Sequence, residues 1–301
     1  MKSDLPDLFP GFETRVVRAN QTRLFCRIGG SGPPLLLLHG YPQSHVIWHE
    51  IAPDLAENFT LVMPDLPGYG SSSVPAVSAT HEAYSKRVMA SAMRELMRTL
   101  GHDHFFVAGH DRGGRVAYRL ALDHPETVPR LAVLDILPTS DYWDRLDRAF
   151  GLKVYHWMFL AQPFPFPEKM IAAAPIRYLE HTLASWTADK NLDCFTQGAL
   201  KHTRRWFCEP DRISACCEDY RAGATIDYEH DRADQENGKT IKGSLLALWG
   251  DKGIAMSVDD PLAVWRTWCP HVQGRSIPCG HFLPEEASKE TAAALRAFFS
   301  D

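Results

Sequence analysis

The chain has 301 residues, of which 45% are hydrophobic and 23% are charged. These fractions are close to globular averages, and they exclude a disordered, collagen-like or membrane-embedded chain. The formal net charge of -5 offers no basic surface, so we expect neither nucleic acid nor a membrane as a partner. A chain of this length can bury one large core and still carry an insertion.

The N-terminal residues and the cysteines bear on the compartment. Residues 1–7 contain acidic residues and prolines, whereas a secretory signal begins with basic residues followed by an apolar run. Apolar runs such as Leu35–Leu38 are far too short to span a bilayer. The seven cysteines are scattered, and the adjacent Cys216 and Cys217 are expected to point to different faces of a helix rather than to form a redox pair. We therefore expect a soluble cytoplasmic protein.

Short apolar or β-branched runs alternate with helical patterns along the chain. This alternation is typical of a largely parallel sheet with helices on both faces, here with an antiparallel edge formed by the first two strands. The predicted strands are Thr14–Arg18, Leu24–Gly29, Leu35–His39, Thr60–Asp65, His104–Gly109, Leu131–Asp135, Leu245–Trp249 and Gly274–Ile277. The predicted helices between them are Val46–Ile51, Tyr84–Leu100 and Gly113–His124.

The pattern changes in the middle of the chain. Between about residues 140 and 234 aromatic residues are frequent, prolines cluster at Pro163–Pro167, and no convincing buried strand occurs. Strand signals resume at Leu245. We therefore expect a core made of residues 1–139 and 235–301, with a helical cap of residues 140–234 inserted in it.

One predicted strand runs into a predicted helix through Gly109-His110-Asp111-Arg112-Gly113. The pattern Gly-x-nucleophile-x-Gly is that of a nucleophile elbow, in which small residues let a strained turn close. Asp111 stands where serine hydrolases place serine. The motif and the strand pattern predict an α/β-hydrolase fold, a mostly parallel eight-stranded sheet flanked by helices with an inserted cap. The alternative is a plain turn in which Asp111 caps the helix.

A general base and an orienting acid are expected after later strands. His281 follows the last predicted strand, where the base stands in chain order. Asp135 and Asp251, each at the end of a strand, could both orient it. In hydrolases that place the acid after the seventh strand, it lies about three residues past the glycine, and here that position is Gly253. We therefore favour Asp135 and interpret Asp251 as a turn residue.

A carboxylate nucleophile restricts the chemistry. It attacks an sp³ carbon that bears a leaving group, and the resulting alkyl ester must then be hydrolysed. His281 would activate water for this second step, and the oxyanion formed on Asp111 would need two backbone N–H donors. Tyr41, in the segment His39–Pro42, is expected to supply one donor, and Arg112 the other.

Two arginines lie beside the predicted nucleophile. Arg112 and Arg115 are three residues apart at the start of the predicted helix, so their side chains can share a face that flanks Asp111. Guanidinium groups form paired hydrogen bonds with carboxylates, so the two could hold an acid against the like charge of Asp111. Alternatively, both arginines are solvated surface residues.

The run Gly109–Arg115, together with Asp135, Tyr155-His156-Trp157 and Gly280–Pro284, closely resembles fluoroacetate dehalogenases. The resemblance extends over essentially the whole chain. It implies attack by Asp111 on the α-carbon of a 2-haloacid, with Arg112 and Arg115 binding the substrate carboxylate. Water would then be activated by His281 and Asp135.

The same resemblance implies that His156, Trp157 and Tyr220 bind the departing halide. Fluoride accepts strong hydrogen bonds, so converging N–H and O–H donors would stabilise it. The resemblance also implies a homodimer, and we expect no metal and no cofactor. The chain departs from the family pattern at Gly114, where relatives carry alanine, and at Tyr41, whose hydroxyl could change the polarity of the pocket.

Three other functions fit parts of the sequence. An epoxide hydrolase shares the aspartate nucleophile and needs cap tyrosines, for which Tyr155, Tyr178 and Tyr220 are available. A haloalkane dehalogenase usually has tryptophan directly after the nucleophile, where this chain has Arg112. A non-catalytic ligand-binding protein of the same fold would typically lack the nucleophile or the base, and this chain has both.

Overall fold

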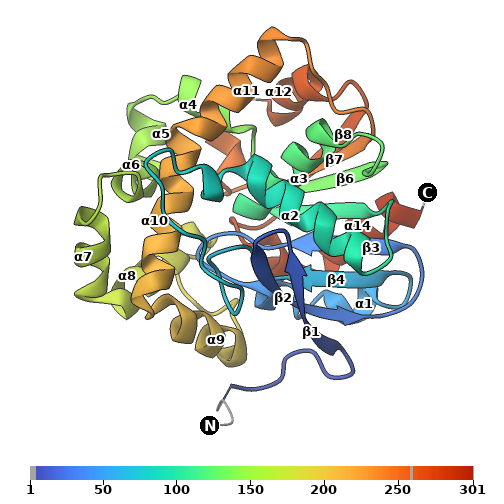
Figure 1. Ribbon diagram of the computed structural model, residues 1–301, viewed down its shortest axis with the longest axis horizontal. Helices are drawn as coiled ribbons and strands as arrows, with labels where there is room; N and C mark the ends of the chain where they lie inside the picture. Colours follow the sequence, from blue (N-terminus) through green and yellow to red (C-terminus); the bar gives the residue numbers. More distant parts are fainter. Residues whose placement is uncertain (1–4, 258–259, 301) are drawn as a thin grey trace.

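A computed structural model describes residues 5–257 and 260–300 of the chain (Figure 1). Within these residues, eight strands form one sheet in the order β1-β2-β4-β3-β5-β6-β7-β8. The β1–β2 and β2–β4 pairs are antiparallel, and the other pairs are parallel. The strands are β1 (Glu13–Ala19), β2 (Thr22–Gly29), β3 (Pro34–Leu38), β4 (Thr60–Pro64), β5 (Phe106–His110), β6 (Arg130–Leu134), β7 (Ser244–Gly250) and β8 (Val272–Ile277).

The predicted fold class and strands are confirmed. Each strand begins and ends within two residues of its predicted bounds, and the first two strands form the antiparallel edge. The strand order reverses next to β3, because β4 pairs with one of its sides and β5 with the other. Ligands of open α/β sheets bind outside the carboxyl ends of the strands at such a switch point. Residues that directly follow β3 and β5 are therefore placed for chemistry.

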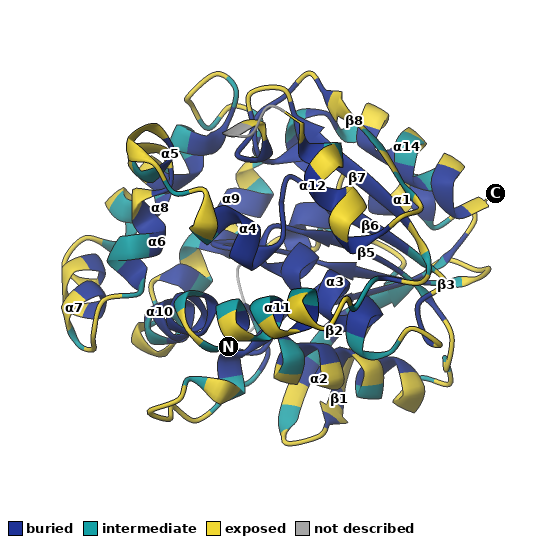
Figure 2. Ribbon diagram, turned by 90° about the horizontal axis from the view of Figure 1, so that it is seen from above, coloured by how far each residue is buried: buried dark blue, intermediate teal, exposed yellow. Residues whose placement is uncertain are grey.

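Helices cover both faces of the sheet, and the central strands β3 to β7 are largely buried (Figure 2). One apolar core includes residues of α2, α3 and α12, and the second includes residues of η1, α1 and α14. The helices outside the 140–234 segment are η1 (His45–Trp48), α1 (Ala52–Leu55), η2 (Glu82–Tyr84), α2 (Lys86–Thr99), α3 (Arg112–Asp123), η3 (Ala255–Ser257), α12 (Pro261–Trp268), α13 (Leu283–Glu286) and α14 (Ser288–Ser300). None of the helices described is both long and apolar enough to cross a membrane.

The helix predicted over Val46–Ile51 is wrong in type and extent. The segment begins with the 3₁₀ helix η1, in which His49 N–H donates to Val46 O, and Ile51 N–H next donates to Trp48 O. A separate short helix, α1, follows with proline in its first turn, where no N–H is needed. The helix predicted from Tyr84 begins later, at Lys86, because the Ser85 side chain accepts a hydrogen bond from Val88 N–H and caps it.

Between β6 and β7 the described residues form helices and no strand. Figure 1 draws α4 to α10 together on one side of the sheet. We propose the division into a core (1–139 and 235–301) and a cap (140–234) on this basis. The helices of the segment are α4 (Thr139–Asp144), α5 (Arg148–Lys153), α6 (Tyr155–Leu160), α7 (Phe166–Ala172), α8 (Pro175–Trp186), α9 (Gln197–Phe207), α10 (Pro210–Ala224) and α11 (Ile226–Glu236).

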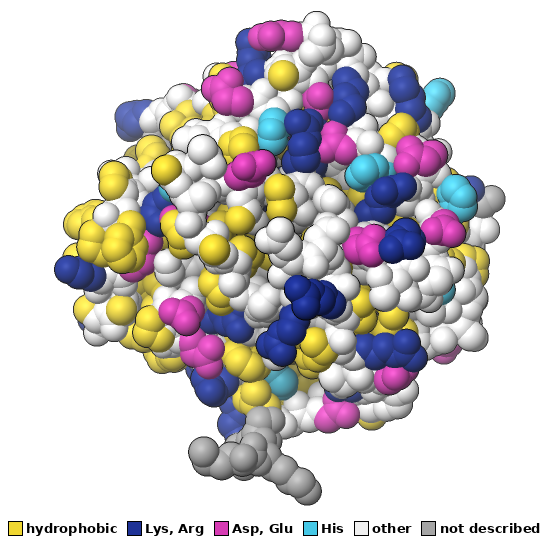
Figure 3. All heavy atoms as spheres, in the orientation of Figure 1, with side chains coloured by type: hydrophobic (Ala, Val, Ile, Leu, Met, Phe, Trp, Pro, Cys, Tyr) yellow, Lys and Arg dark blue, Asp and Glu magenta, His cyan; other side chains and the backbone are white. Residues whose placement is uncertain are grey.

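The surface of the molecule carries mixed charges and one apolar area. On the face in Figure 3, acidic and basic side chains are interspersed, and apolar side chains gather on the side where Figure 1 draws α7. Phe164, Phe166 and Met170 are exposed in and next to this helix. The seven cysteines are free, and Cys216 and Cys217 are both buried in α10.

The tight strand-to-helix turn makes a stability prediction. A Cβ on Gly113 would lie 2.3 Å from the carbonyl oxygens of both Leu38 and His39, which are backbone atoms that cannot move aside. We expect Gly113→Ala to cost roughly 1–3 kcal/mol of unfolding free energy and to lower the Tm. In the control Gly151→Ala, the new Cβ would make only ordinary contacts in helix α5, so the Tm should stay or rise. Equal Tm values for the two variants would contradict this packing.

Candidate active site

Asp111 lies in the turn between β5 and α3 with φ 48° and ψ -119°. This left-handed conformation is unusual for a residue with a side chain and is typical of a nucleophile elbow. A Cβ on Gly109 would lie 2.4 Å from Gly113 O, so both predicted small residues are needed for the turn to close. The side chain of Asp111 makes no cap hydrogen bond with α3, which argues against the alternative of a plain helix cap.

The segment after β3 contacts the Asp111 carboxylate. Tyr41 N–H donates to Asp111 Oδ1 over 2.9 Å. The approach is close because Gly40 has no side chain: a Cβ there would lie 2.4 Å from Asp111 Cβ. The N–H of Arg112, the second predicted oxyanion donor, makes no hydrogen bond with this carboxylate in the structure. One of the two predicted donors is therefore already in contact with the carboxylate.

His281 and Asp135 form a close pair beside Asp111. His281 Nδ1 lies 2.6 Å from Asp135 Oδ2, and because a carboxylate accepts, Nδ1 carries the proton. Nε2 then presents its lone pair, 3.9 Å from Asp111 Oδ2 and without a hydrogen-bond partner in the described part of the chain. The structure thus brings Asp111, Asp135 and His281 together, whereas Asp251 is exposed.

The position of Asp135 explains the glycine at 253. A Cβ on Gly253 would lie 2.3 Å from Asp135 Oδ1, so the carboxylate of Asp135 fills the space that a side chain at 253 would need. Two backbone N–H groups after Gly253 hold it there, from Ile254 at 2.8 Å and Ala255 at 3.3 Å. The carboxylate of Asp135, which directly follows β6, therefore occupies the space of a side chain after β7.

Nearby charges shift the pKa values of both Asp111 and His281. Burial favours the neutral carboxyl of Asp111, but the nearby His281, His110, Arg112 and Arg115 outweigh it and hold its pKa below the usual value. Burial also disfavours the charged imidazole of His281. The hydrogen bond to Asp135 and the charges of Asp135 and Asp111 outweigh that effect and raise its pKa above 6.5.

Arg112 is buried and already paired. Its Nε and Nη2 donate to the Asp219 carboxylate over 3.1 and 2.8 Å, and Asp219 also accepts from Lys86 and from Tyr69 Oη. The guanidinium lies 4.4 Å from the centre of the Tyr220 ring. Arg112 Nη1 has no hydrogen-bond partner among the described residues, so it remains available to a ligand. Neither arginine is a solvated surface residue, as the alternative interpretation would require.

Arg115 is buried without a carboxylate partner among the residues described. Its Nη1 donates to Thr139 Oγ1 over 2.8 Å and to Leu137 O over 3.4 Å, and its Nε has no partner. The guanidinium lies over the rings of Trp157 and Tyr142, at 4.8 and 5.3 Å. A buried cation without a salt bridge is costly, and an anionic ligand bound directly to it would lower that cost.

The three residues implied for halide binding come from the cap. The His156 and Tyr220 rings lie 5.6 Å apart, and both His156 Nδ1 and Tyr220 Oη are buried without a partner among the described residues. Burial lowers the pKa of His156 to about 3, so the ring is neutral and carries one N–H donor. The Trp157 ring lies 6.4 Å from that of His156 and packs against Arg115, so His156 is the residue that contacts both of the others.

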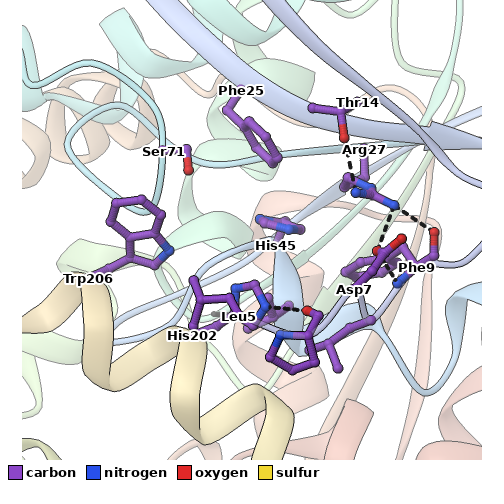
Figure 4. A pocket seen from close by; sticks show the side chains of 13 residues that line it. Leu5, Asp7, Phe9, Thr14, Phe25, Arg27, His45, Ser71, His202 and Trp206 are labelled. Carbon is purple, nitrogen blue, oxygen red and sulfur yellow. Dashed lines mark hydrogen bonds and ion pairs between the residues drawn. The ribbon is translucent and has the colours of Figure 1, made fainter. Parts of the chain in front are cut away.

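A second histidine–aspartate pair lies elsewhere in the core. His45 Nδ1 is 2.7 Å from Asp65 Oδ1, and the ring lines a pocket of about 380 Å³ together with His202 and Trp206 of α9 (Figure 4). The acidic side chain in this pocket wall, Asp7, is paired with Arg27. A histidine–aspartate contact alone therefore does not mark a candidate active site, and Asp111, with its positive φ, distinguishes the pair at His281 from this one.

The geometry agrees with comparisons against known proteins. Residues 33–288 match the model of the alpha/beta hydrolase fold family. The chain belongs to this family. It is 44% identical to fluoroacetate dehalogenase of Burkholderia sp, over 98% of this chain and 96% of that one. It is 31% identical to the soluble epoxide hydrolase of Corynebacterium sp. (strain C12), over 93% and 95% of the two chains.

Solved structures agree with this membership. The crystal structure of ALR0039 from Nostoc sp PCC 7120 has a TM-score of 0.93 at 50% identity, covering 96% of this chain and 98% of that one. The structure of epoxide hydrolase CorEH has a TM-score of 0.86 at 30% identity, covering 96% and 99%. The chain is thus an α/β hydrolase, and the resemblance to fluoroacetate dehalogenases is confirmed as a similarity.

Two site residues of this α/β hydrolase have no motif of their own in the sequence. Asp219 precedes Tyr220 directly, and its link to Arg112 is a contact between residues 107 positions apart. Trp186 ends α8 and lies 5.4 Å from His281 and 4.4 Å from His156, ring to ring. The sequence gives only a weak indication of Asp219: two predicted site arginines in an acidic chain are expected to have acidic partners.

The raised pKa of His281 can be tested by titration. We expect NMR of the free enzyme to give a pKa above 6.5 for this imidazole, and a lower value in Asp135→Asn, where the main stabilising partner is lost. Hydrolysis requires the neutral ring, so its rate should rise with pH through that pKa. The stabilising effect on folding has the opposite sign: it is present below pH 6.5 and is lost as pH rises through the folded pKa.

Asp251→Asn is the matched control, because it removes the same charge from the rejected acid position. It should leave the His281 titration unchanged. A larger shift in Asp251→Asn than in Asp135→Asn would assign the orienting acid to Asp251.

Proposed function

We propose that this α/β hydrolase is a dehalogenase of short 2-haloacids, which converts fluoroacetate and water into glycolate and fluoride through an ester on Asp111. The observation that carries the proposal is the buried Arg115 guanidinium, which has no acidic partner among the residues described and lies on the same helix start as the ionised nucleophile. A substrate with its own carboxylate would supply that partner.

In the first step the ionised Asp111 attacks the α-carbon of the haloacid. A new bond forms between a carboxylate oxygen and that carbon, while the carbon–halogen bond breaks and the halide leaves with its electron pair. Arg115 and the free Nη1 of Arg112 would hold the substrate carboxylate during the attack. The lowered pKa of Asp111 supports this step, because only the ionised form is nucleophilic.

In the second step His281 Nε2 takes a proton from water, and the resulting hydroxide attacks the carbonyl carbon of the Asp111 ester. Tyr41 N–H, already 2.9 Å from Oδ1, would stabilise the oxyanion. The tetrahedral intermediate expels glycolate, which takes the proton back from His281. Asp111 returns to its ionised form by releasing a proton to solvent, so one proton and one halide leave per turnover.

Halide departure would be assisted by donors in the cap. His156 supplies one N–H from a neutral ring, Tyr220 supplies an O–H without a partner in the described structure, and Trp157 lies beside them. Hydrogen bonds to a leaving anion in a dry pocket strengthen as charge develops. This supports His156, Trp157 and Tyr220 as halide ligands.

Epoxide hydrolysis is the second candidate, supported by the relative from Corynebacterium and by tyrosines near the site. Tyr178 and Tyr220 have buried hydroxyls without a described partner, whereas Tyr155 is exposed. The epoxide reaction would not use the unbalanced charge of Arg115, and for this reason we favour the haloacid.

A fluoride-electrode assay separates the two functions. The wild-type protein should release fluoride from fluoroacetate, Asp111→Asn should release none, and His281→Asn should accumulate the ester, visible as a mass increase on the peptide that contains residue 111. Asp251→Asn is the control and should keep the wild-type rate. Release of no fluoride by the wild type, together with hydration of styrene oxide, would reject the dehalogenase proposal.

Arg115→Leu tests the anion site. Hydrogen bonds between charged groups contribute roughly 1.5–3 kcal/mol, so the KM for fluoroacetate should rise on the order of tenfold to a hundredfold. Arg98→Leu removes an arginine from an exposed position on α2 and should leave the KM unchanged. An unchanged KM in Arg115→Leu would remove this residue from substrate binding.

We also propose an oligomeric state, a cellular location and the absence of a cofactor. We expect a homodimer, and the exposed Phe164, Phe166 and Met170 offer an apolar surface for it. We also expect a cytoplasmic location and a reaction that needs no cofactor.

A further inference from the structure

One carboxylate organises the loop that carries His281. Glu286, the last residue of α13, accepts hydrogen bonds from three backbone N–H groups. Gly280 N–H and Ala188 N–H donate to its Oε2 over 2.9 and 2.7 Å, and Phe282 N–H donates to its Oε1 over 2.9 Å. Hydrogen bonds to a charged acceptor are stronger than neutral ones, so this is a rigid local arrangement.

The three donors come from two parts of the chain. Gly280 and Phe282 are the immediate neighbours of His281, whereas Ala188 follows helix α8. The N–H of His281 itself donates to Trp186 O over 3.0 Å. The three successive backbone N–H groups of the base loop are thus all bonded, two to Glu286 and one to the segment 186–188.

The two segments approach so closely that no side chain fits between them. A Cβ on Gly280 would lie 2.4 Å from Ala188 N and 2.6 Å from Trp186 O. The Trp186 ring then lies against both His281 and His156. A displacement of segment 186–188 would therefore disturb the base and the proposed halide site together.

We propose that Glu286 is a positioning residue, which fixes His281 for water activation by clamping its loop to segment 186–188. The inference rests on the proposed function, since it assigns Glu286 to the hydrolysis of the ester. Asp135 fixes the imidazole at Nδ1, but the ring can still turn if its backbone shifts. Glu286 restrains that backbone on both sides of His281.

Glu286→Ala is the direct test. Loss of orientation should slow ester hydrolysis by roughly tenfold to a hundredfold. The Kd of fluoroacetate for ester formation, taken from the concentration dependence of the single-turnover rate, should change by less than about threefold, since the arginines are untouched. The ester on Asp111 should therefore accumulate in single-turnover experiments with fluoroacetate. Glu286→Gln keeps one acceptor oxygen and should recover part of the rate.

Glu290→Ala is the matched control. Glu290 is exposed on the next helix, α14, so its replacement changes the net charge equally without touching the loop. It should hydrolyse the ester at the wild-type rate. Equal hydrolysis rates in Glu286→Ala and Glu290→Ala would overturn the proposal.

A measurement without substrate separates this inference from the proposed function. The His281 Nδ1–H proton, bonded to Asp135, should give a sharp downfield NMR signal in the wild type and in Glu290→Ala, and a broadened or lost signal in Glu286→Ala. A sharp signal in Glu286→Ala rejects the clamp whatever the enzyme's substrate is. If the signal is sharp in the wild type and broadened in Glu286→Ala, but the wild type releases no fluoride, only the dehalogenase function is rejected.

Glu286→Gln covers the case in which Glu286→Ala does not fold. It keeps the shape of the side chain and one acceptor oxygen but removes the charge, so the three hydrogen bonds should weaken. A folded Glu286→Gln protein should show a smaller broadening of the same signal and ester hydrolysis slower than that of the wild type. Wild-type behaviour in both measurements would overturn the clamp.

Discussion

The strained turn at Asp111 is the constraint on which the site depends. A non-glycine residue with positive φ costs about 1–3 kcal/mol, so the surroundings must hold it in place. Here β3 and β6 flank β5, Gly40, Gly109 and Gly113 leave room for the turn, and Asp111 N–H donates to Leu134 O. The turn lifts the carboxylate above the carboxyl end of the sheet, where Tyr41 and His281 meet it.

Asp135 has the same kind of strained backbone after the neighbouring strand. It also has positive φ, 52°, and it follows β6, which pairs in register with β5 up to His110 and Leu134. Two carboxylates thus follow adjacent strands, and the His281 ring lies between them, 2.6 Å from Asp135 and 3.9 Å from Asp111. Asp135 is bonded by two backbone N–H groups and an imidazole, so it stays fixed, whereas Asp111 keeps a free oxygen for reaction.

The two arginines beside the site differ in their partners, and only one of them forms a salt bridge. Asp219 neutralises Arg112, while Arg115 is held by neutral groups and aromatic rings. A buried cation that forms no salt bridge favours an anionic ligand, although Asp111 lies nearby. The negative net charge of the chain does not oppose this, because the relevant charges are buried and local.

The sequence predicted the parts of the fold and site that have local patterns. Buried strands are recognisable from short apolar runs, and the elbow from glycine spacing, so Asp111 and the strands could be found. Even the choice of Asp135 depended on a local fact, the glycine at 253. Asp219 and Trp186 could not be predicted this way, because they contact distant segments, and Glu286 could not because its partners are backbone N–H groups, which leave no pattern in the sequence. The 3₁₀ helix at His45–Trp48 was missed because its apolar pattern resembles that of an α-helix.

We propose that a carboxylate oxygen of Asp111, and not water, displaces the leaving group. A single turnover in oxygen-18 water with enzyme in excess over fluoroacetate tests it directly. Because water attacks the carbonyl carbon of the ester, the label should appear in the Asp111 carboxylate, and the first glycolate released should be unlabelled. Labelled glycolate with an unlabelled Asp111 would show direct attack by water and would contradict the account.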